Sequence, residues 1–219
     1  MSNEVSTIGG FSLDSLGELK KAAADHSEFA YIKFDKGDWL LGKEREEVDS
    51  KTTLWAVNPS SFKHGFQEWG DNKPGAKIMR ALHEPVTKDE LTLEFMQATD
   101  DDEIAEARKM GLIPVTEHRV SENREMRMVC TQGEMKNMTV AFQTSSTGGR
   151  SGVMELFHNI VRGIEKNPET PIPVIRLGSK SKTYNIPQKN GTLQTIHVKQ
   201  PVFTIEFFDD IQATKSNQL

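Results

Sequence analysis

Residues 138–167 read MTVAFQTSSTGGRSGVMELFHNIVRGIEKN, and this stretch decides the fold because it joins a strand to a helix. The run MTVAF is typical of a buried strand, and the apolar residues that follow the glycines recur at helical spacing. They predict a helix over residues 151–166, which Asn167-Pro168 ends. Between the two, Gly148-Gly149-Arg150-Ser151 predicts a strand-to-helix turn with Ser151 near the N-cap. An arginine at such a helix start can also donate to a backbone phosphate.

Apolar segments on both sides of this stretch predict further strands. They are REMRMVCTQG (124–133), PIPVIRLG (171–178) and IHVKQPVFTIEFFDD (196–210), with SKSKTYNIPQKNGTLQT (179–195) as a long polar, basic loop. The order strand–strand–helix–strand–loop–strand is what remains of an OB-fold once its first strand is supplied from upstream. We therefore expect a β-rich α+β fold of one or more OB-like antiparallel barrels, with the helix at 151–166 packed against it.

The N-terminal half contains a second set of short alternating segments. FAYIKF (29–34) and WLLG (39–42) flank a turn and predict a β-hairpin, and strands follow in TTLWAV (52–57), FKHGFQEW (62–69) and AKIMRAL (76–82). DDDEIAEARKMG (100–111) predicts a short helix, because acids stand in its first turn and bases in its last. We expect a flexible arm at 1–26, a single β-rich domain at 27–210 and a disordered tail at 211–219. Within the domain, an acidic helical insertion at 84–112 separates the sub-blocks 27–83 and 113–210.

Composition excludes several classes of protein. The chain has 219 residues, a net charge of −5 and one cysteine, Cys130, so it holds no intrachain disulfide and no cysteine-based zinc site. The N-terminus lacks a basic segment followed by an apolar one, and no apolar run reaches the roughly 20 residues that span a bilayer. These features predict a cytoplasmic protein.

Charge is distributed unevenly along the chain. Residues 144–200 contain eight basic and three acidic residues and therefore carry +5, whereas acids gather between Glu84 and Glu106. Such asymmetry indicates a polyanionic partner, although an ordinary solvated surface gives the same pattern.

The sequence carries no recognisable catalytic, nucleotide or metal motif. A Walker A loop read back from Gly149 would need glycine where Thr144 stands and lysine where Arg150 stands. The six histidines lack metal-ligand spacing, and Asp100-Asp101-Asp102 at a helix start point in different directions. We therefore predict a non-enzyme that needs no metal or other cofactor.

Eight aromatic residues crowd into residues 29–69, interleaved with lysines and a histidine. Aromatic faces beside lysines on a β-surface are typical of proteins that bind single strands, but alternate aromatics of a small barrel also form its core. We take Tyr31, Trp39 and Trp69 as candidate exposed platforms, and Tyr184 as another in the basic loop. The predicted nucleic-acid-binding residues are Arg150, Arg176, Lys180, Lys182, Tyr184, Lys189, Lys199, Lys33, Trp39 and Trp69.

Four stretches of the chain resemble a largely uncharacterised family of phage and prophage proteins. They are FDKGDWLLG (34–42), WAVNPSSFKHGFQEWGD (55–71), FQTSSTGGRSGVMELF (142–157) and PVFTIEFFD (201–209), of which the W-x-V-N-P-x-S-F-x-H-G pattern is the most distinctive. The acidic 84–112 segment departs from the family pattern and looks like an insertion. The resemblance implies a phage context, and with it the cytoplasm of an infected bacterial cell and a role in DNA metabolism.

The expected function is that of a phage-type single-stranded DNA-binding protein that acts in replication or recombination. Its partners would be single-stranded DNA and phage or host replication and recombination proteins, and a homo-oligomer is compatible with this role. The alternative is a protein-binding module, such as a phage inhibitor of a host factor or a virion accessory protein, that uses its acidic face (84–106). The C-terminal residues ATKSNQL lack the acidic tail that many single-strand-binding proteins carry.

Overall fold

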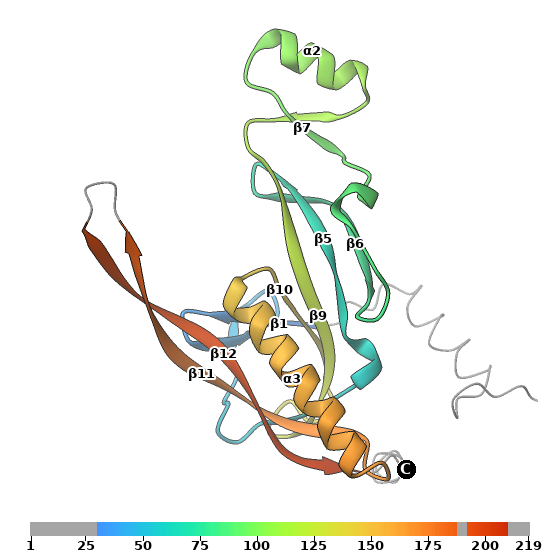
Figure 1. Cartoon of the computed structure of the whole chain (residues 1–219), viewed down its shortest axis with the longest axis vertical. Helices are drawn as coiled ribbons and strands as arrows, with labels where there is room; N and C mark the ends of the chain where they lie inside the picture. The colour runs from blue at the N-terminus through green and yellow to red at the C-terminus, as the bar shows by residue number, and fades with distance from the viewer. Residues whose placement is uncertain (1–29, 188–191, 210–219) are drawn as a thin grey trace, which may run out of the picture.

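The computed structural model describes residues 30–187 and 192–209. The predicted flexible N-terminal segment at 1–26, Lys189 and the predicted tail at 211–219 therefore lie outside the described residues. A ten-stranded sheet curls into a half-barrel, and helix α3 (Thr147–Lys166) packs against it (Figure 1). Its strands are β1 Ala30–Asp35, β2 Asp38–Leu41, β3 Glu46–Glu47, β4 Leu54–Val57, β5 Lys63–Gly70, β6 Lys73–Ala81, β9 His118–Gln132, β10 Thr139–Thr144, β11 Ile172–Pro187 and β12 Leu193–Asp209. A smaller sheet pairs β7 (Phe95–Gln97) with β8 (Ile113–Val115), and helix α2 (Asp101–Lys109) connects them. The β-rich class, the packed helix and the short acidic helix are thus confirmed.

The two sub-blocks predicted from the sequence share one sheet. The strand order is β12-β11-β4-β9-β10-β1-β2-β3, and β5 pairs with both β9 and β6. The long strand β9 is therefore the spine, since it is antiparallel to β4, β5 and β10. The β1–β10 pair is parallel, which departs from the purely antiparallel arrangement that we expected.

Trp39 is a core residue, which corrects its assignment as an exposed platform. In the β1–β2 hairpin it pairs with Phe34 and is 2% exposed, because side chains alternate between faces and this one lies on the face of Ile32. Its indole N–H donates to the carbonyl of Gly178 at 3.0 Å, and its ring packs against Phe203. Trp39 thus ties β2 to β11 and β12 and holds the sheet in its curled shape.

Helix α3 begins four residues earlier than the sequence predicts. Ser146 is its N-cap, and the Ser146 hydroxyl accepts a hydrogen bond from the backbone N–H of Gly149 at 3.1 Å. A Cβ on Gly149 would lie 2.2 Å from Thr144 Oγ1, and one on Gly148 would lie 2.8 Å from Gln200 Nε2. The paired glycines therefore lie inside the first helical turn, where they let the helix approach β10 and β12. The predicted N-cap at Ser151 is wrong.

The predicted basic loop at 179–195 is also wrong, because β11 and β12 continue through it as a long antiparallel hairpin. Their pairing runs from Ile172 opposite Asp209 to Pro187 opposite Leu193. We call the described residues 179–187 and 192–200 the arm, which projects away from the body of the molecule (Figure 1). Most arm residues are exposed, so the sequence shows no buried face there and resembles a loop.

Residues 84–117 form an acidic lobe at the end of the β5–β6 hairpin (Figure 1). The ring of Phe95 packs against the backbone of Gly70 and Gly75, where a Cβ would come within 2.7 Å and 2.4 Å of it. Leu91, Phe95 and Val115 are each less than a tenth exposed. The lobe thus has a small apolar contact with the sheet.

The buried carboxylate of Glu68 adds a polar attachment for the acidic lobe. It accepts hydrogen bonds from the backbone N–H groups of Ala76 (3.2 Å), Glu94 (2.9 Å) and Phe95 (3.0 Å), and His118 Nε2 lies 2.9 Å from Glu68 Oε1. Burial by itself would raise the pKa of Glu68, but these hydrogen bonds outweigh it and lower the pKa below the usual value. The charged Glu68 carboxylate therefore links the sheet to the lobe through hydrogen bonds.

The W-x-V-N-P-x-S-F-x-H-G motif at residues 55–65 serves the fold. Trp55 and Phe62 are core residues at 0% and 2% exposure, and the Asn58 side chain caps the short 3-10 helix η1 (Pro59–Ser61). The Ser61 hydroxyl accepts from the backbone N–H of Arg127 at 2.8 Å. A Cβ on Gly65 would overlap the carbonyl oxygen of Ile78 at 1.9 Å, so only glycine fits against β6.

Candidate nucleic-acid interface

One face of the arm brings together lysine, tyrosine and aliphatic side chains. Lys180, Lys182 and Tyr184 alternate along β11 and therefore point to the same side, and the directly paired residues Val198 and Gln200 of β12 point with them. The Lys182 ammonium lies 5.1 Å from the centroid of the Tyr184 ring, and Gln200 Nε2 donates to the Tyr184 hydroxyl at 2.7 Å. These residues, with Ile186 and Ile196, are called the arm face below.

The arm face adjoins the start of helix α3. The Lys180 ammonium lies 3.9 Å from a carboxylate oxygen of Glu155, and the side chain of Gln200 covers the backbone of Gly148. Gln200 is 8% exposed, so the first turn of α3 is occupied by a protein side chain. The start of α3 is therefore in contact with the base of the arm.

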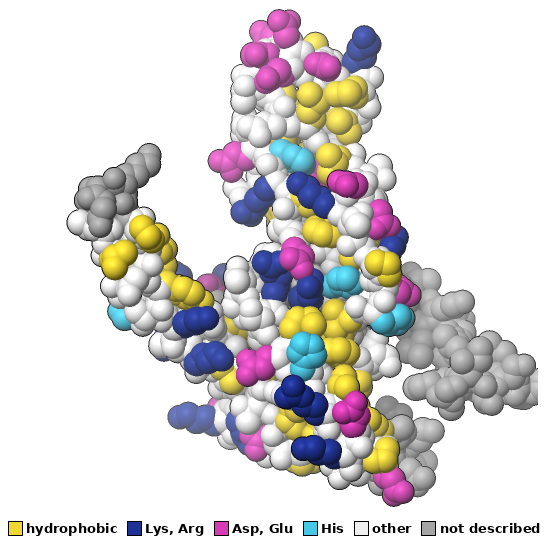
Figure 2. Space-filling model, viewed as in Figure 1, with side chains coloured by type: hydrophobic (Ala, Val, Ile, Leu, Met, Phe, Trp, Pro, Cys, Tyr) yellow, Lys and Arg dark blue, Asp and Glu magenta, His cyan; other side chains and the backbone are white. Residues whose placement is uncertain are grey.

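The arm face is cationic and partly apolar. None of the arm residues is acidic. Lys180 and Lys182 are exposed, as are Ile186 and Val198 at 42% and 39%. Figure 2 shows Lys and Arg side chains around the base of the arm, whereas Asp and Glu side chains gather on the acidic lobe. A surface of this composition can take phosphates on its lysines and stack a base on its tyrosine.

Among the described residues, the other predicted basic residues do not join the arm face. Arg150 forms an ion pair with Glu122, and Arg176 binds both Glu206 (2.9 Å) and the carbonyl oxygen of Lys51. Both arginines therefore already have partners within the fold. Lys199 points to the opposite side of the arm, toward the β1–β2 turn, where a Cβ on Gly37 would meet its Cγ at 3.3 Å.

Lys33 and Tyr31 lie on the outer side of β1, opposite the buried face of Ile32. Tyr31 is 48% exposed, so this predicted platform is accessible among the described residues. The two residues belong to a different surface from the arm face, and the structure does not bring the two sets together.

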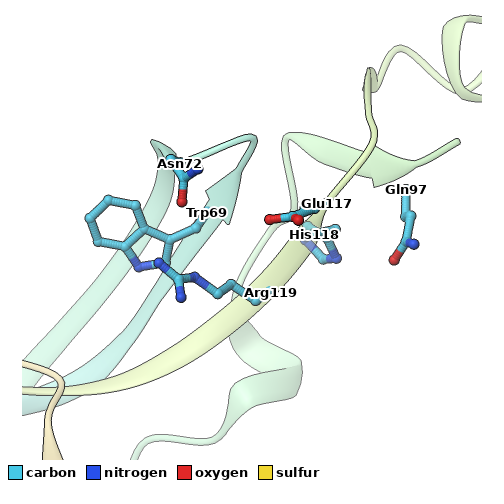
Figure 3. A pocket seen from close by; sticks show the side chains of 6 residues that line it. All are labelled: Trp69, Asn72, Gln97, Glu117, His118 and Arg119. Atoms are coloured by element: carbon cyan, nitrogen blue, oxygen red, sulfur yellow. The ribbon is translucent and has the colours of Figure 1, made fainter.

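Trp69 lines an open pocket of about 280 Å³ between the β5–β6 turn and the acidic lobe (Figure 3). The other lining residues are Asn72, Gln97, Glu117, His118 and Arg119. The Arg119 guanidinium lies over the Trp69 ring, 5.7 Å from its centroid. Sequence reasoning found Trp69 but missed Arg119, although the pairing of Trp69 with Arg119 across β5 and β9 makes them neighbours.

Within the described residues, no group of three or more His, Cys, Asp or Glu side chains could hold a metal ion. No helix in the described ranges is long and apolar enough to cross a membrane. Comparison of the chain with protein-family models, with curated proteins and with solved structures finds no match. The functional assignment therefore has to come from the surfaces themselves.

Proposed function

We propose that the chain is a phage-type single-stranded DNA-binding protein that acts in replication or recombination. The observation that carries the proposal is the arm face, where Lys180, Lys182 and Tyr184 share one surface that contains no carboxylate of the arm itself. Lysines spaced two residues apart along a strand can follow a phosphate backbone, while the tyrosine ring offers a sequence-tolerant stacking surface. In this proposal the curled sheet with its packed helix is an OB-like scaffold, and the arm extends its binding surface.

The test is fluorescence anisotropy with a labelled oligo-dT over a salt series. Each lysine that neutralises one phosphate of a single strand adds about 0.7 to the slope of log K against log salt, so Lys180→Ala with Lys182→Ala lowers the slope by about 1.4. The matched control is Lys33→Ala with Lys199→Ala, which changes the net charge equally but leaves the arm face intact. An equal slope change in the two double variants would locate the binding elsewhere. A dissociation constant weaker than roughly 10⁻⁴ M at low salt would exclude DNA binding altogether.

A second candidate function is a protein-binding module that uses the acidic lobe. The observation that favours it is the exposure of Leu93 (40%), Met110 (53%) and Ile113 (55%) beside the acids of α2. Exposed apolar residues next to charge are typical of an interaction surface. Replacing these three residues by serine leaves oligonucleotide binding unchanged if DNA binding is the function of the arm. Loss of DNA binding in that variant would instead place the lobe in the DNA site.

A further inference from the structure

The Trp69 pocket is a second surface, distinct from the arm face. Trp69, Arg119 and Ser121 point to one side of the β5–β9 pair, whereas Glu122 points to the other side and forms an ion pair with Arg150 of helix α3. Side chains alternate between the two faces of a strand, so Trp69 and Arg119 lie on the face of the β5–β9 pair opposite that of Glu122, while His118 lines the pocket from the other face at the start of β9.

Hydrogen bonds hold the walls of the pocket in place. The Trp69 indole N–H donates to the Ser121 hydroxyl at 3.0 Å, which fixes the plane of the ring. Asp71 and Asn72 form the β5–β6 turn with positive φ angles of 49° and 64°. The Asp71 carboxylate accepts from the backbone N–H of Thr116 and of Glu117, at 3.0 Å and 2.9 Å, and so ties the turn to the lobe.

Three polar groups that line the pocket have no hydrogen-bond or ion-pair partner among the described residues. The side chains of Asn72 and Gln97 form no hydrogen bond with any described residue, and Arg119 forms no salt bridge within the described ranges. His118 is held through Nε2 by Glu68, which leaves its Nδ1. The pocket therefore combines an aromatic ring held by a hydrogen bond, a guanidinium that lies over that ring, two amides that can donate and accept, and the carboxylate of Glu117.

We propose that this pocket binds a single unpaired nucleobase, which stacks on the Trp69 ring as the Arg119 guanidinium moves away from that ring to cover the base, and which Asn72 and Gln97 read at its edge. An indole and a guanidinium are the two side-chain planes on which unstacked bases are most readily held. Amide groups match the mixed donors and acceptors of a base edge. The volume of about 280 Å³ is of the size of one nucleotide. The site stands apart from the arm face, and its occupancy does not depend on the proposed function.

Ligand binding is measured by quenching of tryptophan fluorescence, with saturation-transfer NMR as the second readout. Trp39 and Trp55 are 2% and 0% exposed, so quenching by a small ligand reports Trp69. The ligands are dAMP, dCMP and dTMP, with deoxyribose 5-phosphate and maltose as controls for a phosphate site and a sugar site. We expect saturable binding of the nucleotides with a dissociation constant on the order of 1 mM, and no binding of either control. Equal binding of either control would overturn the proposal.

Two variants separate a binding role from a structural one. Arg119→Ala removes an exposed side chain and is expected to weaken nucleotide binding about tenfold, while Arg108→Ala on α2 is the matched arginine control with no change. Trp69→Ala abolishes both the quenching and the saturation transfer. Wild-type nucleotide affinity for Trp69→Ala, measured by saturation-transfer NMR, would refute the assignment. A urea unfolding midpoint close to that of the wild type shows that the variant is folded.

The source of the base is resolved in the protein that carries Lys180→Ala and Lys182→Ala. If the pocket serves free nucleotides, the affinity of this variant for dAMP equals its affinity per base for a short oligonucleotide. If it takes a base from a strand, a trinucleotide binds at least tenfold more tightly than dAMP, and an abasic trinucleotide loses that advantage. Loss of DNA binding by the arm variant with intact dAMP binding would support the two proposals separately. Unchanged DNA binding with intact dAMP binding would leave the pocket standing and require the function proposed for the arm to be revised.

Discussion

Replacing Glu68 by glutamine tests how the acidic lobe is joined to the sheet. The carboxylate is fully buried and accepts three backbone N–H groups, two of them from the lobe residues Glu94 and Phe95. Glutamine has nearly the same shape but presents only one oxygen, so its amide cannot serve the same set of donors. The substitution thus removes hydrogen-bond acceptors without creating a cavity.

The magnitude follows from the geometry. With the amide oxygen in the place of Oε2, Ala76 and Glu94 keep their acceptor, and His118 can adapt by changing tautomer. The N–H of Phe95 then faces an NH₂ group, and one buried unsatisfied donor costs about 1–3 kcal/mol. Glu68→Ala leaves all three N–H groups without the carboxylate and costs more, about 3 kcal/mol or above. Glu106→Gln, on the exposed surface of α2, is the matched control with a change near zero.

Hydrogen exchange measures the effect where it arises. A loss of about 1–3 kcal/mol lowers amide protection at Glu94 and Phe95 by about 5- to 150-fold, while protection at Val140 and Phe142 in β10 stays close to wild type. The pKa of Glu68 in the folded state lies below its ordinary value of 4.5, so its stabilising contribution is complete above that pH and is lost as the pH falls through the folded pKa. The difference between the wild type and Glu68→Gln should therefore shrink below about pH 4.5. Unchanged protection at Glu94, or a difference as large at pH 3 as at pH 7, would refute this account of the lobe.

Three further predictions concern the body of the protein. Gly149→Ala places a Cβ 2.2 Å from Thr144 Oγ1 and should cost about 1–3 kcal/mol in urea unfolding, despite the higher helix propensity of alanine; a gain in stability would mean that the helix start is not packed this tightly. Gly65→Ala meets the carbonyl of Ile78 at 1.9 Å and should cost at least as much, whereas a neutral result would show that β5 and β6 are further apart. Burial raises the pKa of the Cys130 thiol, so a thiol reagent at pH 8 should label it only after unfolding, and rapid labelling of the native protein would contradict its 0% exposure.

The parts of the fold that the sequence predicts are those in which one face is buried. The hairpin at residues 30–41 and the helix ending at Lys166 have an apolar side that packs into the core, and both are present in the structure. The strands of the arm could not be predicted from a buried face. Pairing of β11 with β12 maintains them, and most of the arm residues face solvent. Trp39 shows the opposite error, since the periodicity of a hairpin does not say which of its two faces the rest of the chain will cover.

Most residues of the distinctive motif serve the fold, whereas Trp69 at the end of the same stretch lines the pocket. Trp55, Asn58, Ser61, Phe62 and Gly65 in the distinctive motif are each required by core packing, capping or a close backbone approach. A motif that the fold needs would persist whatever the protein binds, so it identifies an architecture more strongly than an activity. The arm face and the Trp69 pocket instead contain side chains with few structural obligations, such as Lys182 and Arg119, that could change without loss of the fold. For this reason the charge-matched variants at those two surfaces, rather than further comparison of the motif, decide what the protein does.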